Sequence, residues 1–220
     1  MLDLNLKEIE YIEESHLYLV NGVITPSVTQ ILQAIFPSKY EGIPQYILDN
    51  KKDFGTNVHE AIENDFKGLD INLSPLEELA YKEYLKLRKK HVINPVYMEE
   101  IVAYKDIYAG RLDMIADVNY TRCLIDVKTT ATLDKEYLEY QLGYYKLALE
   151  DMGIKVAHCY VIWLPKKDKG EFKKIIPKTK NKLMKGIELY EKHNPRWKSM
   201  LLHRYNKRPR CSSHHGRSSI

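Results

Sequence analysis

The chain has 220 residues and a mass of 25.9 kDa, a size that suits one domain with small elaborations. An apolar content of 44% is enough for a sizeable core, while 29% charged residues and a mean hydropathy of −0.45 are typical of a soluble protein. No apolar run approaches the roughly 20 residues of a membrane span, and the first residues lack the features of a signal peptide, so we expect no membrane association.

The net charge of +4 is unevenly distributed along the chain. No acidic residue follows Glu191, whereas eight lysines and arginines do, so residues 1–191 carry 26 basic and 30 acidic side chains. This body is not a uniformly basic nucleic-acid binder. Contacts with phosphate would have to come from local patches, such as the lysines between 166 and 185, whose other interpretation is a solvated surface.

The three cysteines, Cys123, Cys159 and Cys211, are widely separated in the chain. Such spacing predicts neither a disulfide framework nor a cysteine-rich metal site. We therefore expect a reducing, cytoplasmic setting.

The first structural signal is the dipeptide Asn21-Gly22, which lies between apolar flanks in residues 16–24 and predicts a β-hairpin. Ser27 then suits the N-cap of a helix that begins at Val28. Three more helices are expected: over 44–53, from Gly55 onward with Val58, Ile62 and Phe66 along one face, and from Ser74 to about Lys90.

The second half of the chain alternates strands with helices. Asp134 suits the N-cap of a long helix that ends near Met152, and residues 156–164 predict a strand buried on both faces. Further strands are expected over about 96–104, 107–118, 122–129 and, more weakly, 170–176, with a last helix over 178–193. This order predicts an α/β fold with a mixed central β-sheet flanked by helices. The segment from about Lys198 has no apolar pattern, so we expect it to be disordered.

Two acidic residues lie within apolar runs that a short polar turn joins. Asp113 follows Gly110 in the first run, while Asp126 and Lys128 end the second. Residues two apart in a strand point to the same face, so Asp126 and Lys128 can serve one site. Burying an aspartate is costly unless a cation or donors compensate, and a pair of aspartates binds a hard divalent cation. Asp117, which is nearer the turn, is interpreted as a solvated carboxylate.

The ordered pair Gly-X-X-Asp and Asp-X-Lys resembles the signature motifs of the PD-(D/E)XK nuclease superfamily. Gln141 and Tyr145, four residues apart on the helix after Lys128, are similar to the Gln-X-X-X-Tyr motif of the RecB-like branch. The other interpretation of this segment is an amphipathic helix rich in tyrosine. The resemblance implies a restriction-endonuclease-like core in which Gln141 and Tyr145 lie beside the active site and bind DNA.

The same resemblance implies two further metal ligands. Related nucleases place a glutamate on the strand before Gly-X-X-Asp, and their Glu-X-X-Val spacing favours Glu99, with Glu100 as the competitor. RecB-like nucleases also take an imidazole ligand from an early helix, a position that His59 matches. A lone helical histidine is more often a surface or core residue. Glu63, one turn further, is either the partner of the other ring nitrogen or an ordinary exposed glutamate.

The resemblance extends over about residues 55–165, and residues 18–32 look like the opening of small phage-encoded RecB-like exonucleases. We expect an N-terminal hairpin and helical elaboration over 1–54, a nuclease core over 55–195 and a basic tail over 196–220. Relatives with an iron–sulfur cluster carry four cysteines, so three dispersed cysteines predict no cluster. The chain lacks a Gly-X-X-X-X-Gly-Lys-Ser/Thr loop, so we expect no nucleotide cofactor, and any unwinding falls to a helicase or recombination partner.

The implied activity is that of an Mg²⁺- or Mn²⁺-dependent deoxyribonuclease in a bacterial or phage-infected cell. It would be an exonuclease that hydrolyses single-stranded DNA or DNA ends in replication, recombination or repair. Asp113 and Asp126 would act in catalysis with Lys128, and the expected metal ligands are His59, Glu99, Asp113 and Asp126.

Three alternatives stay open at this point. A non-catalytic DNA-binding or assembly module on the same fold would be expected to lack a carboxylate or the lysine, and none is missing. A restriction-type endonuclease would need a dimer and a recognition element, for which the short loops between 104 and 129 leave little room. An RNA-processing factor is the third.

Overall fold

In the computed structural model, the described residues are 8–13, 17–37, 45–166 and 168–195. An antiparallel sheet near the N-terminus consists of β1 (Ile9–Ile12), β2 (Leu17–Val20) and β3 (Val23–Thr25). Asn21 and Gly22 join β2 to β3 with φ angles of 52° and 69°, as a tight hairpin turn requires. The predicted hairpin is therefore confirmed, and β1 adds a strand that the sequence pattern did not predict.

The central sheet has five strands in the order β4-β5-β6-β7-β8. Their bounds are β4 Ile93–Tyr104, β5 Tyr108–Val118, β6 Thr121–Lys128, β7 His158–Trp163 and β8 Glu171–Ile175. Strands β6 and β7 are parallel and the other neighbours are antiparallel, so the predicted mixed sheet is confirmed.

Strand β4 begins before Pro95, although Asn94-Pro95 was expected to precede the strand. It lies at an edge of the sheet, where a residue without an N–H group is tolerated. The pairing with β5 shifts by one residue between Pro95 and Tyr97, a β-bulge that accommodates the proline.

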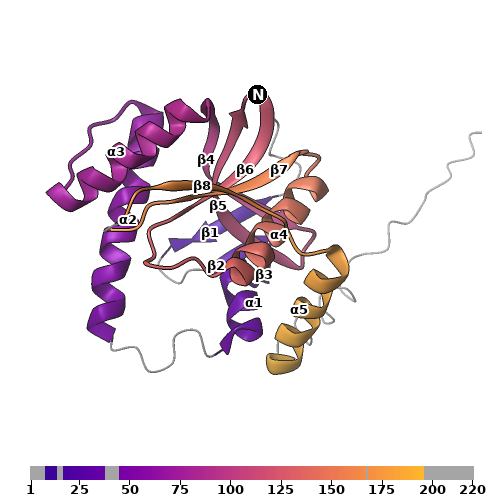
Figure 1. Cartoon of the computed structure of the whole chain (residues 1–220). Helices are drawn as coiled ribbons and strands as arrows, with labels where there is room; N and C mark the ends of the chain where they lie inside the picture. The colour runs from indigo at the N-terminus through magenta and orange to yellow at the C-terminus, as the bar shows by residue number, and fades with distance from the viewer. Residues whose placement is uncertain (1–7, 14–16, 38–44, 167, 196–220) are drawn as a thin grey trace, which may run out of the picture.

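Two helical layers enclose this sheet (Figure 1). One face carries α2 (Gln45–Lys67) and α3 (Pro75–Lys90), which contribute Val58 and Tyr84 to one hydrophobic cluster. The opposite face carries α1 (Val28–Ile35), α4 (Lys135–Asp151) and α5 (Lys180–His193) around a larger cluster. The expected sheet flanked by helices is thus confirmed, with a hydrophobic cluster on each face.

Helix α2 differs from the prediction, because it runs unbroken through the position where two separate helices were expected. Residues 54 and 55 lie inside it. A Cβ atom on Gly55 would lie 3.1 Å from Oγ1 of Thr129, so the glycine permits close packing against the end of β6 and is no helix break. Phe66 was also placed wrongly: Val58 and Ile62 are buried, whereas Phe66 is 41% exposed.

The predicted caps are found at the starts of three helices. Ser27 caps α1 and Asp134 caps α4 through their side chains, while Ser74 and Glu77 form a capping box at the start of α3. Among the described helices, none is both long enough and apolar enough to cross a membrane. The expected disorder of the tail from Lys198 concerns residues outside the described part of the chain.

Candidate metal centre

The centre is built where strands β5 and β6 separate. Their last backbone pair is Met114 with Ile125, and the next pair in this register would be Asp113 with Asp126. Instead of a ladder bond, the carboxylate of Asp113 accepts a hydrogen bond of 2.7 Å from the backbone N–H of Val127. This contact closes the end of the hairpin and holds the two aspartates in one place.

Asp126 and Lys128 form an ion pair, with Nζ of the lysine 2.9 Å from Oδ1 and 2.7 Å from Oδ2 of the aspartate. The sequence prediction that both side chains share a face of β6 is therefore confirmed. Asp126 is only 2% exposed, and burial raises the pKa of its carboxyl against the opposing effect of the Lys128 ammonium. Breaking such a buried pair by removing one partner is costly, so the two residues act as a unit.

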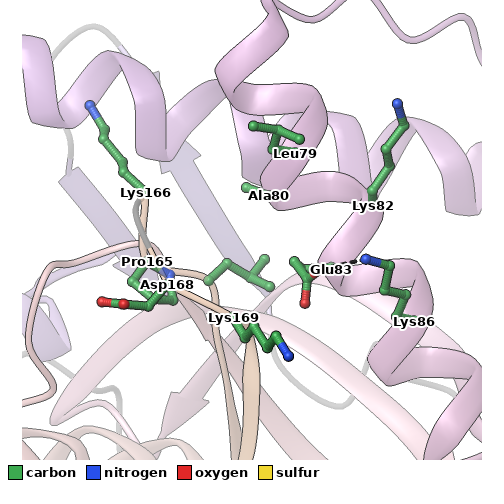
Figure 2. Close-up of a pocket in the computed structure, with 10 residues that line it drawn as sticks. Leu79, Ala80, Lys82, Glu83, Lys86, Pro165, Lys166, Asp168 and Lys169 are labelled. Carbon is green, nitrogen blue, oxygen red and sulfur yellow. Dashed lines mark hydrogen bonds and ion pairs between the residues drawn. The ribbon is translucent and has the colours of Figure 1, made fainter.

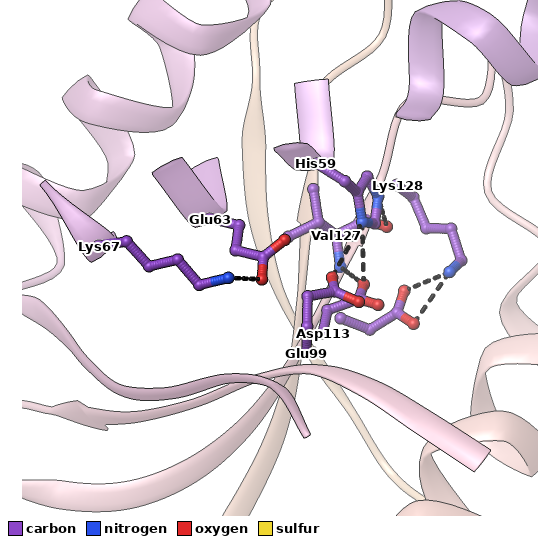
Figure 3. Close-up of polar contacts among 8 residues, drawn as sticks. His59, Glu63, Lys67, Glu99, Asp113, Val127 and Lys128 are labelled. Atoms are coloured by element: carbon purple, nitrogen blue, oxygen red, sulfur yellow. Dashed lines mark hydrogen bonds and ion pairs between the residues drawn. The ribbon is translucent and has the colours of Figure 1, made fainter. Parts of the chain in front are cut away.

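His59 reaches this centre from α2 (Figure 3). Its Nε2 lies 3.1 Å from the carbonyl oxygen of Val127, and a carbonyl can only accept, so the neutral ring donates from Nε2. The lone pair then resides on Nδ1, which faces Asp113 at 3.8 Å and Glu99 at 3.9 Å. A backbone carbonyl thus selects the tautomer that a metal ligand needs.

The charge environment of His59 is acidic. Burial lowers the pKa of the imidazole, but the carboxylates of Asp113 and Glu99 outweigh it, and the net pKa is raised. Without a cation, the ring therefore holds its proton more tightly than usual. A divalent cation that binds Nδ1 must displace that proton.

Glu99, not Glu100, lies in this cluster. Register pairs on either side, Met98 with Met114 and Glu100 with Leu112, place Glu99 across from Asp113. Glu99 has a φ of 53°, a left-handed conformation that is costly for a residue with a Cβ atom. Glu100 lies outside the cluster, where burial raises the pKa of its carboxyl.

The donor atoms of His59, Glu99 and Asp113 all lie within 4.8 Å of one another. Ligands about 2.1 Å from one ion are separated by roughly 3–4 Å, so a small contraction would let all three donors bind one ion, with water or substrate in the remaining positions. One imidazole and two carboxylates fit Mg²⁺ or Mn²⁺ by donor type, with the nitrogen favouring Mn²⁺. Asp126 is not a member of this triad and its carboxylate pairs with Lys128, so its role as a metal ligand stays a prediction.

Two other carboxylates were weighed in the sequence and are occupied elsewhere. Glu63 forms an ion pair with Lys67 and does not contact the ring of His59, whose second partner is Val127 (Figure 3). Asp117 pairs with Arg122 at 2.7 Å, near the turn between β5 and β6. Asp117 is therefore a partly exposed, ion-paired carboxylate, whereas a solvated one was expected.

Tyr145 and Gln141 come from α4, on the other side of the site. Tyr145 is 6% exposed, and burial together with the carboxylates of Asp113 and Asp126 raises the pKa of its hydroxyl. The ring is thus enclosed beside the aspartates and has no open face for stacking on a base. Oε1 of Gln141 is buried and lacks a hydrogen-bond partner among the described residues.

Two further residues, Val127 and Tyr18, contribute to the centre and were not predicted from the sequence. Val127 acts through its backbone, for which a sequence carries no residue-type signal. Tyr18 of β2 is buried near Glu99 and Arg111: burial raises the pKa of its hydroxyl, Arg111 lowers it and Glu99 raises it. The N-terminal sheet therefore covers one side of the centre, a contact that the apolar flanks of Asn21-Gly22 could have suggested only in part.

No family model and no curated protein matches this chain. Among solved structures, a protein named SSO0001 is similar at 16% identity with a TM-score of 0.38, over 76% of this chain and 73% of that one. A proposed exonuclease from Eubacterium rectale is similar at 12% identity with a TM-score of 0.34, over 88% of this chain and 76% of that one. Scores this low reflect partial superposition and carry no argument about activity.

Proposed function

We propose that this chain is a metal-dependent nuclease of the PD-(D/E)XK superfamily, in the RecB-like branch, that hydrolyses phosphodiester bonds of DNA. One observation carries the proposal. A triad of metal-type donors, His59 Nδ1 with the carboxylates of Glu99 and Asp113, lies beside the buried ion pair of Asp126 and Lys128. A purely structural ion pair would not need an imidazole whose tautomer presents a lone pair to two carboxylates.

A bound Mg²⁺ or Mn²⁺ would supply Lewis-acid polarisation of a phosphoryl oxygen and lower the pKa of a water. The chain supplies the remaining parts. His59, Glu99 and Asp113 hold the cation, and the backbone of Val127 fixes two of these three by hydrogen bonds.

Lys128 provides a positive charge that is already in place. Asp126 holds the ammonium within 3 Å by two contacts, so Lys128 loses little freedom when a phosphate group arrives. The ammonium would offset the negative charge that builds on the phosphoryl oxygens during attack. In this function Asp126 positions Lys128 and would also offer its carboxylate to a bound cation.

Gln141 is suited to receive a donor from water or substrate. A buried amide oxygen without a hydrogen bond destabilises the fold by about 1–3 kcal/mol, so such atoms are rare unless a ligand satisfies them. Oε1 of Gln141 is such an atom, on the helix that also carries Tyr145. Tyr145 would pack beside Asp113 and Asp126, while Gln141 would accept a hydrogen bond from water or substrate in the site.

The proposed substrate is single-stranded DNA or a DNA end, and the proposed mode is exonucleolytic. Wild-type protein and the variants Lys128→Ala and Asp113→Asn are incubated with end-labelled linear and with circular single-stranded DNA, in Mg²⁺, Mn²⁺ or EDTA. We expect wild-type cleavage with either metal and none in EDTA. Loss of one charge-stabilising group costs about 100- to 1,000-fold in rate, so both variants should lose cleavage but still bind DNA.

The exposed Lys155, at the far end of β7 from Lys128, provides a matched control as Lys155→Ala. It should cleave at the wild-type rate. Thermal unfolding of every variant separates loss of catalysis from loss of the fold. Full Mg²⁺-dependent cleavage by Lys128→Ala or Asp113→Asn would refute the assignment, and degradation of circular DNA would refute the exonucleolytic mode.

A further inference from the structure

A second basic feature lies next to the metal centre. A cavity of about 270 Å³ separates α3 from the turn between β7 and β8. Figure 2 shows its apolar floor, which includes Leu79, Ala80 and Pro165, and the lysines on its rim. This volume is just below the range typical of pockets that enclose a whole small ligand, so the cavity suits part of a larger molecule.

The rim is positively charged. Four lysines line the cavity against two carboxylates, and these residues are Lys82, Lys86, Lys166, Lys169, Glu83 and Asp168. Within the described part of the chain, no carboxylate lies at ion-pair distance from Lys166 or Lys169, and Lys166 instead lies 4.3 Å from the ring centre of Phe54. Lys82 pairs with Glu78 of the same helix at 2.8 Å, an exposed contact that contributes little.

Leu164 links the cavity to the metal centre. Lys128 and Trp163 are partners at the carboxyl ends of the parallel strands β6 and β7. The next residue, Leu164, donates its backbone N–H to the carbonyl of Lys128 at 2.7 Å and lines the cavity with its side chain. Ligands of such sheets bind outside the carboxyl ends of parallel strands, so one molecule can contact Lys128 and the cavity together.

The turn between β7 and β8 is held against α3. The backbone N–H of Gly170 lies 3.3 Å from Oε2 of Glu83, and a Cβ atom on Gly170 would lie 3.1 Å from the side chains of Leu164 and Leu87. The lysines on either side of the cavity are therefore presented by a packed scaffold. A preorganised pair of cations loses less freedom on binding than lysines on a free loop.

We infer that this cavity binds the sugar–phosphate backbone of the DNA strand next to the cleaved bond, with Lys166 and Lys169 as its phosphate contacts. The inference rests on the proposed nuclease function and names the path of the substrate away from Lys128. The chemistry favours a polyanion over a single small anion, because the cations surround an apolar floor that a nucleotide's sugar or base can cover.

The test measures binding of a fluorescent oligothymidylate in EDTA, over a range of salt concentrations. Each phosphate contact on a single strand contributes about 0.7 to the slope of log K against log [salt]. The double variant Lys166→Gln/Lys169→Gln should therefore have a slope smaller by roughly 1.4 and an affinity lower by on the order of tenfold near 0.1 M salt.

The control removes the same charge at the other end of the sheet. Lys155 and Lys174 are exposed; Lys155 precedes β7, and Lys174 lies opposite Tyr160 in the first half of that strand. Lys155→Gln/Lys174→Gln should leave the slope unchanged. Inorganic phosphate, at the same phosphate concentration as the oligonucleotide, should fail to compete; full competition would assign the cavity to a free anion and overturn the inference.

The remaining outcomes separate the two proposals. If the wild type binds and cleaves DNA but both double variants behave alike, the cavity is not on the DNA path, and an acidic protein segment becomes the better occupant. The nuclease assignment would survive that result. If the wild type neither binds nor cleaves DNA, both proposals fall together.

Discussion

A Cβ atom on Gly110 would lie 2.9 Å from Cε1 of Tyr145, closer than side chains pack. Val28 of α1 lies on the same side, with its Cγ2 at 3.1 Å from that position. Strand β5 therefore has no space for a side chain at residue 110. The glycine of Gly-X-X-Asp and the tyrosine of Gln-X-X-X-Tyr are two halves of one packing contact, which lets the ring approach Asp113.

Replacement of this glycine should destabilise the fold. Gly110→Ala inserts a methyl group against Tyr145 and Val28, and overpacking of this kind costs about 1–3 kcal/mol in the free energy of unfolding. Urea denaturation would measure the loss. In a Tyr145→Ala background the methyl group has room, so Gly110→Ala should cost less there. Strictly additive costs for the two substitutions would contradict this contact.

His59 should determine metal affinity, and its neighbour on the same helix should not. His59→Ala removes the nitrogen donor that faces Asp113 and Glu99, so Mn²⁺ affinity should fall by at least one to two orders of magnitude. Isothermal titration with Mn²⁺ in the absence of DNA provides the measurement. The readout does not depend on cleavage, so it tests the donor set independently of the nuclease assignment.

Glu63→Ala provides the matched control for that titration. Glu63 is one helical turn beyond His59, and its carboxylate pairs with Lys67. Removal of Glu63 should leave Mn²⁺ affinity within a factor of about two, because exposed ion pairs within a helix contribute little. A loss of Mn²⁺ affinity as large as that of His59→Ala would show that Glu63, and not Val127, fixes the orientation of the His59 imidazole.

Glu77 links α3 to the helix that carries His59. Its carboxylate accepts hydrogen bonds from the backbone and side chain of Ser74 and, at 2.7 Å, from the side chain of Asn57. These donors, Ser74 first and Asn57 second, hold the pKa of Glu77 below its usual value. Asn57 is only two residues before His59, so this contact helps to fix where the imidazole lies.

A lowered pKa predicts the direction of a pH effect. A carboxyl whose folded pKa is depressed stabilises the fold above its unfolded pKa, about 4.3 for glutamate, and the contribution is lost as pH falls through the folded pKa. The free energy of unfolding of the wild type should therefore exceed that of Glu77→Gln by about 1 kcal/mol at neutral pH, a typical value for a helix cap. Urea denaturation across a pH series should show this difference shrinking below about pH 4.

The neighbouring Glu78 gives the control, because it pairs only with Lys82 and is 53% exposed. Glu78→Gln should change stability by a few tenths of a kcal/mol and show no comparable pH dependence. A difference between wild type and Glu77→Gln that stays constant down to acid pH would mean that the ionised form of Glu77 is not favoured by folding.

The sequence predicted those features that local chemistry determines. Ser27 and Asp134 begin helices because their side chains accept hydrogen bonds from nearby N–H groups, and Ser74 begins one through its capping box with Glu77. Each relation is contained within four residues. The pairing of Asp126 with Lys128 follows equally from the two-residue period of a strand.

Features that depend on distant packing were not predictable from one sequence. Gly55 was expected to interrupt a helix. Its actual role, close packing against Thr129, involves residues 74 positions apart and could not be foreseen from the local sequence. Glu63 was considered as the partner of His59. The actual partner is the backbone carbonyl of Val127, and a backbone group leaves no signal in residue types. The packing of Tyr145 against Gly110 likewise joins residues that are distant in the sequence, and neither residue type indicates it.

The left-handed backbone at Glu99 allows effects on the free energy of unfolding to be separated from effects on metal binding. A residue with a Cβ atom pays roughly 1–2 kcal/mol at a φ of 53°, whereas glycine adopts this conformation freely. Glu99→Gly should therefore be more stable than Glu99→Ala by about 1 kcal/mol in urea denaturation. Both variants lack the carboxylate that faces His59, so both should bind Mn²⁺ more weakly than the wild type.

The same pair of substitutions at Glu100 should give the opposite order. Glu100 is not among the residues with positive φ, and it pairs with Leu112 in the sheet. There glycine only adds conformational entropy to the unfolded chain. Glu100→Gly should therefore be less stable than Glu100→Ala by about 0.5–1 kcal/mol. Both variants should retain the Mn²⁺ affinity of the wild type. If glycine proves worse than alanine at both positions, the backbone at Glu99 is not strained, and the cluster with His59 and Asp113 must be held together in another way.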